Sequence, residues 1–177
     1  MNITVYLGAC EGCDPQLKQA VRELGTWIGT SGNSLVYGGS KTGLMGELAL
    51  AALEAGAEVT GVEPQFFVDS VLQLEGLTRL IVTPDIAERK AKMIELGDAF
   101  VAFPGGTGTL EEISQIMSMI GLGQLDAPCV FYNLNGYYNP MAEQLDRMLA
   151  CDLTSPERLQ GISFARNLDE LVACLQA

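Results

Sequence analysis

The clearest chemical pattern in the chain is the segment PGGTGT at residues 104–109, which follows an apolar run and precedes two carboxylates. Its glycines let the backbone approach a ligand closely. We expect the amides of this segment to gather at the start of a helix, where unpaired N–H groups and the helix dipole attract anions. The predicted phosphate-binding residues are Gly105, Gly106, Thr107, Gly108 and Thr109.

Two carboxylates, Glu111 and Glu112, stand directly after this loop and have two interpretations. Thr109-Leu-Glu-Glu112 fits a helix capping box, in which the glutamate accepts from a backbone amide. A carboxylate beside a phosphate site is also well placed to hold ribose hydroxyls or to activate water. The pattern leaves both interpretations open, so Glu112 is a catalytic candidate and Glu111 could share its role.

A second glycine-rich segment, GGSKTGLMG at residues 38–46, also follows a strand-like run and opens a helix-like run. The spacing from Gly38 to Gly43 resembles that of a phosphate loop. However, Leu44 stands where an ATP-binding loop requires lysine. These glycines either bind a ligand, with Gly39 as the candidate residue, or only permit a tight turn.

Three of the ten basic residues, Arg89, Lys90 and Lys92, lie within four positions of a chain whose formal net charge is −12. Such a cluster keeps one cleft attractive to an anion in an otherwise acidic protein. Alternatively, it forms a solvated helix face with Glu88 and Lys92 as an i,i+4 pair. Arg89 is a catalytic candidate and Lys90 a substrate-binding candidate.

The absence of histidine excludes Ser-His-Asp and Cys-His catalysis. Acid–base chemistry must therefore come from carboxylates, Lys, Tyr, Cys or water. The five cysteines are scattered and odd in number, which argues against a disulfide framework. Cys10 and Cys13 form either a redox or metal pair or plain loop residues; without a second such pair or a histidine they complete no zinc site, and we expect no metal.

Composition narrows the class of partner and the location. A strongly acidic chain is a poor general binder of nucleic acid, which demands a basic surface. No apolar run approaches the ~18 residues of a membrane span, and the N-terminus has no basic flank typical of a secretory signal. A cytoplasmic protein without membrane or nucleic-acid partners is the expectation.

Apolar, β-branched runs alternate with segments of helical periodicity, and these elements must position the candidate residues. Strands are expected at residues 3–8, 34–39, 58–62, 78–83, 98–103, 129–133 and 161–165. Helices are expected at residues 14–32, 43–56, 86–97, 108–123, 140–152 and 168–176. This alternation predicts an α/β fold, a Rossmann-like doubly wound parallel sheet, with residues 1–177 forming a single domain.

In such sheets ligands bind beyond the carboxyl ends of the strands. The loops expected at that edge are residues 8–13, 38–46, 63–70, 84–88 and 104–109. Residues 63–77 have no clear periodicity apart from a helical turn around Val71–Leu74, and we expect a loop near the site there.

Taken together, these segments resemble the LONELY GUY family, which is also described as lysine decarboxylase-like. Its signature PGGxGTxxE matches residues 104–112, and the segment that leads into it, ERKAKMIELGDAFVAFPGG at residues 88–106, is family-like. The segment VYGGSKTGLMGELA at residues 36–49 matches the pattern VYGGG-x-x-GLMG-x-x-A, with Ser40 in place of the third glycine. The resemblance covers residues 3–133.

The resemblance implies a phosphoribohydrolase, which cleaves the N-glycosidic bond of a cytokinin riboside 5′-monophosphate, or of AMP, to free base and ribose 5-phosphate. It also implies a homodimer without metal or organic cofactor. The family's arginine and glutamate correspond to Arg89 and Glu112, and its phosphate loop to Gly105–Thr109. Glu112 would then hold the ribose hydroxyls and stabilise an oxocarbenium-like transition state, with Arg89 gripping the nucleotide.

The chain departs from the family pattern at Leu7–Cys10, Ile86-Ala87 and Ser118-Met119, positions that bear on base preference. The alternative is a non-catalytic binder of a nucleotide-like ligand, such as the molybdenum-cofactor carrier proteins. Lysine decarboxylation would need pyridoxal phosphate on a lysine, and no lysine here stands in a recognisable cofactor setting. The apolar segment at residues 113–122 is either a dimer interface or buried core.

Overall fold

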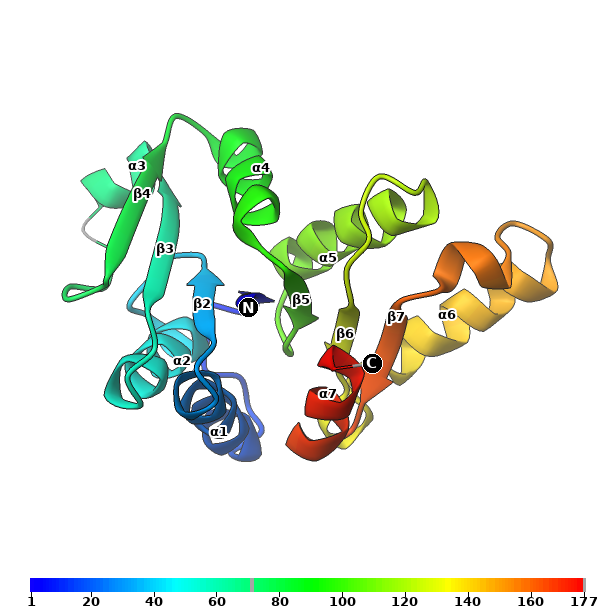
Figure 1. The fold of residues 1–177 in the computed structure, drawn as a ribbon, viewed down its shortest axis with the longest axis horizontal. Helices are drawn as coiled ribbons and strands as arrows, with labels where there is room; N and C mark the ends of the chain where they lie inside the picture. The colour runs from blue at the N-terminus through cyan, green and yellow to red at the C-terminus, as the bar shows by residue number, and fades with distance from the viewer. Residues whose placement is uncertain (71, 177) are drawn as a thin grey trace.

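A computed structural model describes residues 1–70 and 72–176, and within them the strands form one parallel sheet (Figure 1). The strands are β1 (Asn2–Tyr6), β2 (Ser34–Tyr37), β3 (Val59–Pro64), β4 (Arg79–Thr83), β5 (Ala99–Ala102), β6 (Cys129–Tyr132) and β7 (Ile162–Ala165). Their order across the sheet is β4-β3-β2-β1-β5-β6-β7. The predicted doubly wound parallel sheet is therefore confirmed.

Helices cover both faces of this sheet (Figure 1). One face carries α1 (Gln16–Thr30), α2 (Gly43–Glu54) and α7 (Leu168–Leu175), and the other carries α4 (Ile86–Leu96), α5 (Thr107–Gly121) and α6 (Asn139–Ala150). Short turns of helix complete the chain at α3 (Gln65–Asp69), η1 (Leu134–Gly136) and η2 (Pro156–Leu159). Of the helices in the described residues, none is long and apolar enough to cross a membrane.

The two faces of the sheet form two apolar layers because successive side chains of a strand point to opposite sides. On β1, Ile3 and Val5 pack with Leu24 and Ile28 of α1, whereas Tyr6 belongs to the layer beneath α4 and α5. Burying one such aliphatic side chain stabilises the fold by about 1.5–3 kcal/mol relative to exposure. This double burial explains why the strands read as continuous apolar runs.

The expected strands and helices are all present, and most of their ends differ from the prediction by one or two residues. The helical turn expected around Val71–Leu74 is wrong where it can be compared, because the short helix forms earlier, at Gln65–Asp69; Val71 itself lies outside the described residues. The backbone at Leu72 and Leu74 bonds instead to the second glycine loop, accepting from Lys41 and donating to Gly39. Those bonds hold the segment extended.

The chain reverses its direction of progress across the sheet at β1, which lies between β2 and β5. The connections leaving β1 and β5 therefore separate to opposite faces and leave a crevice at the carboxyl ends of these strands. Both glycine-rich segments begin at this edge, after β2 and after β5. The topology alone brings them together.

Candidate active site

A cavity of about 740 Å³ opens at this edge of the sheet. Its walls come from the loops after β1, β2 and β5, from the end of β3 and from the first turn of α4. A volume of this size is typical of small-molecule sites. Every predicted site residue except Gly39 lines the cavity: Arg89, Lys90, Gly105, Gly106, Thr107, Gly108, Thr109 and Glu112.

The first glycine loop has the geometry of an anion-binding site. Helix α5 begins at Thr107 with Gly106 as its N-cap, so the first turn presents backbone amides that have no partner within the helix. A side chain at Gly105 would collide with the hydroxyl of Thr109 and come within 2.8 Å of the Gly8 amide nitrogen. The hydroxyl of Tyr137 donates to the Gly105 carbonyl at 2.5 Å, which fixes the loop from the other side.

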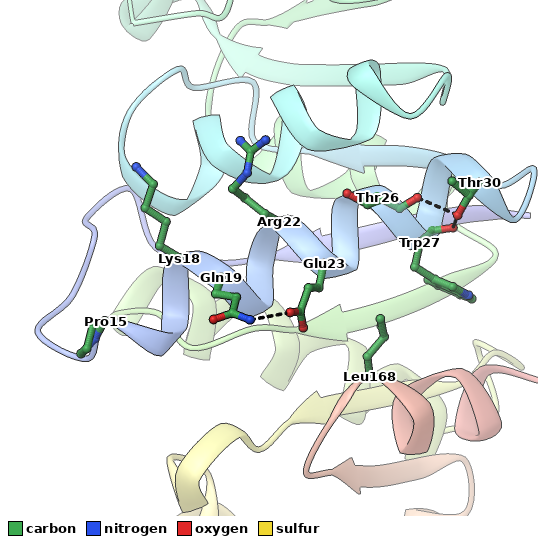
Figure 2. A pocket seen from close by; sticks show the side chains of 9 residues that line it. All are labelled: Pro15, Lys18, Gln19, Arg22, Glu23, Thr26, Trp27, Thr30 and Leu168. Atoms are coloured by element: carbon green, nitrogen blue, oxygen red, sulfur yellow. Dashed lines mark hydrogen bonds between the residues drawn. The ribbon is translucent and has the colours of Figure 1, made fainter.

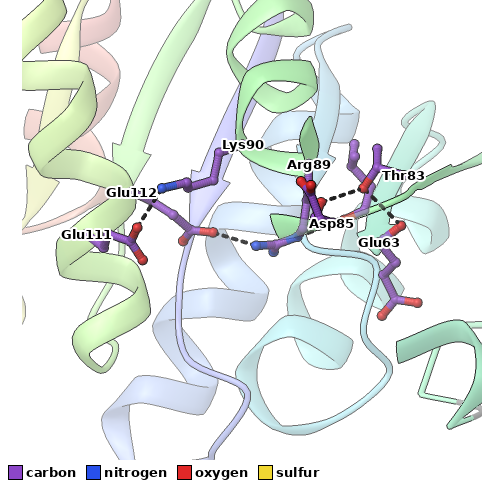
Figure 3. Close-up of polar contacts among 8 residues, drawn as sticks. Glu63, Thr83, Asp85, Arg89, Lys90, Glu111 and Glu112 are labelled. Carbon is purple, nitrogen blue, oxygen red and sulfur yellow. Dashed lines mark hydrogen bonds and ion pairs between the residues drawn. The ribbon is translucent and has the colours of Figure 1, made fainter. Parts of the chain in front are cut away.

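Arg89 and Glu112 form a buried ion pair in the site, and Figure 3 shows their side chains pointing toward one another from α4 and α5. Arg89 Nη1 donates to Glu112 Oε1 at 2.8 Å, and Arg89 Nε donates to the Val62 carbonyl at 3.0 Å. The two side chains are 10% and 8% exposed. A buried carboxylate that faces a guanidinium in a cavity wall is a recurrent feature of functional sites.

This pairing overturns the capping-box interpretation of Thr109 and Glu112. The N-cap of α5 is Gly106 with no side-chain cap, and Thr109 lies inside the helix, 3% exposed. Because Glu112 is one turn further along, its carboxylate reaches across to Arg89 on α4. The two carboxylates therefore have different partners, since Glu111 pairs with Lys90 at 2.5 Å nearer the surface.

Burial sets the electrostatics of Glu112. Removal from water raises the pKa of its carboxyl, and the charge and hydrogen bond of Arg89 oppose that rise. Arg89 thus favours the ionised form of a group that burial would otherwise neutralise. The basic cluster is not a uniform solvated face either: Arg89 is buried, whereas Lys92 pairs with Glu95 rather than with the expected Glu88.

The second glycine loop lies opposite the first. Gly38, Ser40 and Thr42 line the cavity, and the hydroxyls of Ser40 and Thr42 are 2.9 Å apart. Gly39 packs behind the wall instead: its φ is +84°, and a Cβ there would lie 2.5 Å from Glu63 Cγ. The loop therefore contributes hydroxyls and close backbone, while its glycine at 39 makes room for a buried glutamate.

That glutamate, Glu63, is a cavity residue that the sequence analysis missed. It is the next-to-last residue of β3 and is 1% exposed, and neither of its carboxylate oxygens has a hydrogen-bond partner among the described residues. Burial raises the pKa of its carboxyl, and Arg89 lowers it by a smaller amount. A single acidic residue inside the apolar run VTGVEP was the signal in the sequence that marked it.

The cysteines and acidic residues offer no alternative centre in the part of the chain that the structure describes. All five cysteines are free thiols, with Cys10 and Cys13 exposed and Cys10 at the cavity wall. No group of three potential ligands stands close enough to hold a metal ion in these described residues.

A second cavity, of about 690 Å³, lies along α1 and reaches Leu168 at the start of α7 (Figure 2). Its two basic side chains already have ion-pair partners, because Lys18 and Arg22 both pair with Glu47. It is lined by helix surface and contains neither glycine loop. The geometry that suits an anionic ligand is at the carboxyl edge of the sheet.

Comparison with known proteins adds the following findings. A family model described as "Possible lysine decarboxylase" matches residues 45–175. A protein of Rhodococcoides fascians named cytokinin riboside 5′-monophosphate phosphoribohydrolase is 37% identical over 177 residues, covering 99% of this chain and 89% of its own length. One of that name from Arabidopsis thaliana is 35% identical over 175 residues, covering 99% and 82%.

Solved structures extend the likeness at the level of fold. A molybdenum cofactor carrier protein from Chlamydomonas reinhardtii has a TM-score of 0.75 and 22% sequence identity, over 99% of this chain and 95% of that chain. A molybdenum cofactor binding protein from Rippkaea orientalis has a TM-score of 0.71 and 19% identity, over 99% and 94%.

Proposed function

The chain belongs to the LONELY GUY family, and from that premise we propose that it is a phosphoribohydrolase. It hydrolyses the N-glycosidic bond of a nucleoside 5′-monophosphate to free base and ribose 5-phosphate. The relatives named above point to a cytokinin riboside 5′-monophosphate as the substrate, and the family resemblance adds AMP. Residues 1–177 then constitute one nucleotide-binding domain.

The observation that carries the proposal is the combination of two features in one cavity. The amides of Gly105–Thr109 at the start of α5 supply an anion site, and the Arg89–Glu112 pair lies one helical turn away. A 5′-phosphate held by those amides fixes the nucleotide by a group remote from the reacting bond. Its C1′ then comes within range of Glu112 without a separate ribose clamp.

The proposed chemistry passes through an oxocarbenium-like ribosyl transition state, as in carboxylate-assisted glycoside cleavage. Glu112 holds the ribose hydroxyls and stabilises the positive charge that develops at C1′. Arg89 favours the ionised form of Glu112 and orients it. Lys90 and the hydroxyls of Ser40 and Thr42 line the cavity and contact the substrate, whereas Gly39 shapes its wall from behind. Neither a metal nor an organic cofactor takes part.

The competing function is that of a carrier, which binds a nucleotide-like ligand and leaves it intact. The fold of the molybdenum cofactor carriers favours it, but that likeness rests on 19–22% identity. The buried Arg89–Glu112 pair is the feature that favours the enzyme, because a carrier gains nothing from a carboxylate placed beside the glycosidic bond.

A substrate panel separates the two functions. The protein is incubated with AMP, isopentenyladenine riboside 5′-monophosphate and adenosine, and free base and ribose 5-phosphate are quantified. The enzyme releases base from at least one of the two nucleotides, and releases it from adenosine at least ~10²-fold more slowly because the phosphate anchor is missing. Nucleotide binding without any base release would assign the carrier function.

We further propose that the protein acts as a cytoplasmic homodimer, as the family resemblance implies. The apolar stretch at residues 113–122 contains both buried core residues and an exposed residue that could lie in a subunit interface. Ile113 and Ile116 are fully buried in the core beneath α5, whereas Leu122, at the C-terminal end of the helix, is 66% exposed. This exposed end is the candidate for the subunit interface.

A further inference from the structure

One buried ionisable group at the cavity has no role in the mechanism above. Glu63 lines the cavity from β3, which β2 and β1 separate from β5 and the phosphate loop that follows it, and Phe67 and Leu72 of the segment after β3 line the cavity too. Figure 3 shows its side chain turned away from the Arg89–Glu112 contact. Each of its carboxylate oxygens exposes less than 1 Å² and has no hydrogen-bond partner among the residues that the structure describes.

The surroundings of Glu63 favour its protonated form. Tyr37 on β2 is a second buried group, and its hydroxyl has no hydrogen-bond partner among the described residues. Arg89 on α4 is the cation whose charge lowers the pKa of Glu63. Burial raises the pKa of both Glu63 and Tyr37, and for Glu63 the charge of Arg89 offsets this only in part. An unpaired carboxylate at this position would be strongly disfavoured.

A neutral carboxylic acid presents one O–H donor beside one carbonyl acceptor. The edge of a 6-aminopurine presents the complementary pair, a ring nitrogen that accepts and an exocyclic N–H that donates. The apolar side chains of Phe67 and Leu72 suit the faces of such a base. The chemistry of this end of the cavity therefore matches the base, just as the chemistry of the other end matches the phosphate.

We propose that Glu63 contacts the purine base and donates the proton with which the base departs. This assignment rests on the proposed phosphoribohydrolase function and deepens it, since that function leaves the proton donor unnamed. On binding, the carboxyl turns from behind Gly39 toward the base, a movement in which it gives up no hydrogen bond to any described residue.

The step balances as follows. The Glu63 carboxylic acid transfers its proton to a ring nitrogen of the purine while the C1′–N9 bond breaks, and the bonding electron pair stays with the base. The water oxygen forms a bond to C1′ on the face opposite the departing base and releases one proton to solvent. Glu63, now a carboxylate, takes a proton back from water. The sum is nucleotide plus water giving neutral base and ribose 5-phosphate.

The test compares two leaving groups in the same cavity. AMP needs protonation of its base, whereas 4-nitrophenyl ribofuranoside 5-phosphate releases a stable phenolate that needs none. Glu63→Gln keeps the size and the hydrogen-bonding groups of the side chain but cannot transfer a proton. We expect Glu63→Gln to lower kcat on AMP by ~10²-fold or more and to change kcat on the nitrophenyl substrate by less than about threefold.

Controls separate this inference from the function on which it rests. Glu47→Gln, at an ion-paired residue of α2 outside the cavity, should leave both rates unchanged. Glu112→Gln should lower both rates together. If the wild-type protein cleaves both substrates and Glu63→Gln lowers both equally, or neither, the proton-donor assignment is wrong. If the wild-type protein cleaves neither substrate, the proposed function itself fails.

Discussion

Glu112 is the residue on which the proposed chemistry depends most. Its carboxylate is buried, bound to Arg89 and directed into the cavity rather than to the helix end. Glu112→Gln keeps an acceptor for Arg89 and removes the negative charge. We expect turnover to fall by ~10²-fold or more in a variant that remains folded at the assay temperature, because Gln still accepts the Arg89 hydrogen bond. Glu88→Gln, at an exposed position of α4, is the matched control, and equal activity of the two variants would reduce Glu112 to a structural residue.

Arg89 is expected to affect stability as well as activity. It is the only side chain that the described residues provide as a partner for the buried Glu112 carboxylate. Arg89→Met keeps most of the apolar stem but leaves that carboxylate unpaired, which we expect to cost about 3–5 kcal/mol of unfolding free energy. Chemical denaturation measures this loss. In the double variant Arg89→Met/Glu112→Gln part of it should return, because no buried charge then remains.

Glu63 should make stability depend on pH. Its folded-state pKa is raised above the ordinary value of 4.5 by burial, so the folded protein holds this proton more tightly than the unfolded chain does. The stabilisation from that difference is complete below the unfolded pKa and is lost as pH rises through the folded pKa. Glu63→Gln removes this loss. The melting temperature of the variant relative to wild type should therefore rise as pH increases above the ordinary carboxyl pKa of 4.5; a constant difference would show that Glu63 is not perturbed.

At the scale of elements, the start of α5 carries the phosphate site, and Gly105 is its tightest position. An alanine Cβ there would meet the Thr109 hydroxyl and the Gly8 amide nitrogen. We expect Gly105→Ala to cost about 1–3 kcal/mol of stability through overpacking and to weaken inhibition by ribose 5-phosphate. Gly108→Ala, with open space around the new Cβ inside the helix, should instead stabilise the fold by about 0.5–1 kcal/mol. Similar effects of both substitutions on stability would contradict this loop geometry.

The elements themselves were predictable because their patterns are local. Continuous apolar runs predicted the parallel strands, and the glycine spacing of residues 104–109 predicted the loop at the start of α5. The helical turn placed around Val71–Leu74 was wrong because long-range backbone bonds to the second glycine loop decide that segment. The partner of Glu112 could not be predicted from local pattern either, because Arg89 lies 23 positions away in the chain. A capping-box pattern takes account only of residues close in sequence.

The site was predictable in its anion-binding part and less so at the base end. A phosphate site made of backbone amides at a helix start is marked in the sequence by several glycines. A buried acid such as Glu63 is marked only by a single residue within a strand. Its burial without a partner follows from how α3, Gly39 and β3 pack, which no spacing in the sequence reports.

At the scale of the whole molecule, the family resemblance implies a subunit interface. Leu122, at the C-terminal end of α5, is 66% exposed and gives an apolar surface for this interface. We expect light scattering after gel filtration to give about twice the 18.9 kDa mass of the chain. Leu122→Glu should shift the protein toward the monomer if this end of α5 takes part. A monomeric wild-type protein would contradict the dimer, and a dimeric variant would place the interface elsewhere.

The central claim is that one cavity holds a nucleotide's phosphate at the start of α5 and its glycosidic bond beside Glu112. A crystal structure of Glu112→Gln soaked with AMP tests this most directly, because the variant should bind the nucleotide without cleaving it. The account predicts phosphate oxygens within hydrogen-bond distance of the amides of Gly105–Thr109 and C1′ next to residue 112. A nucleotide bound elsewhere, or bound with its phosphate away from those amides, would contradict it.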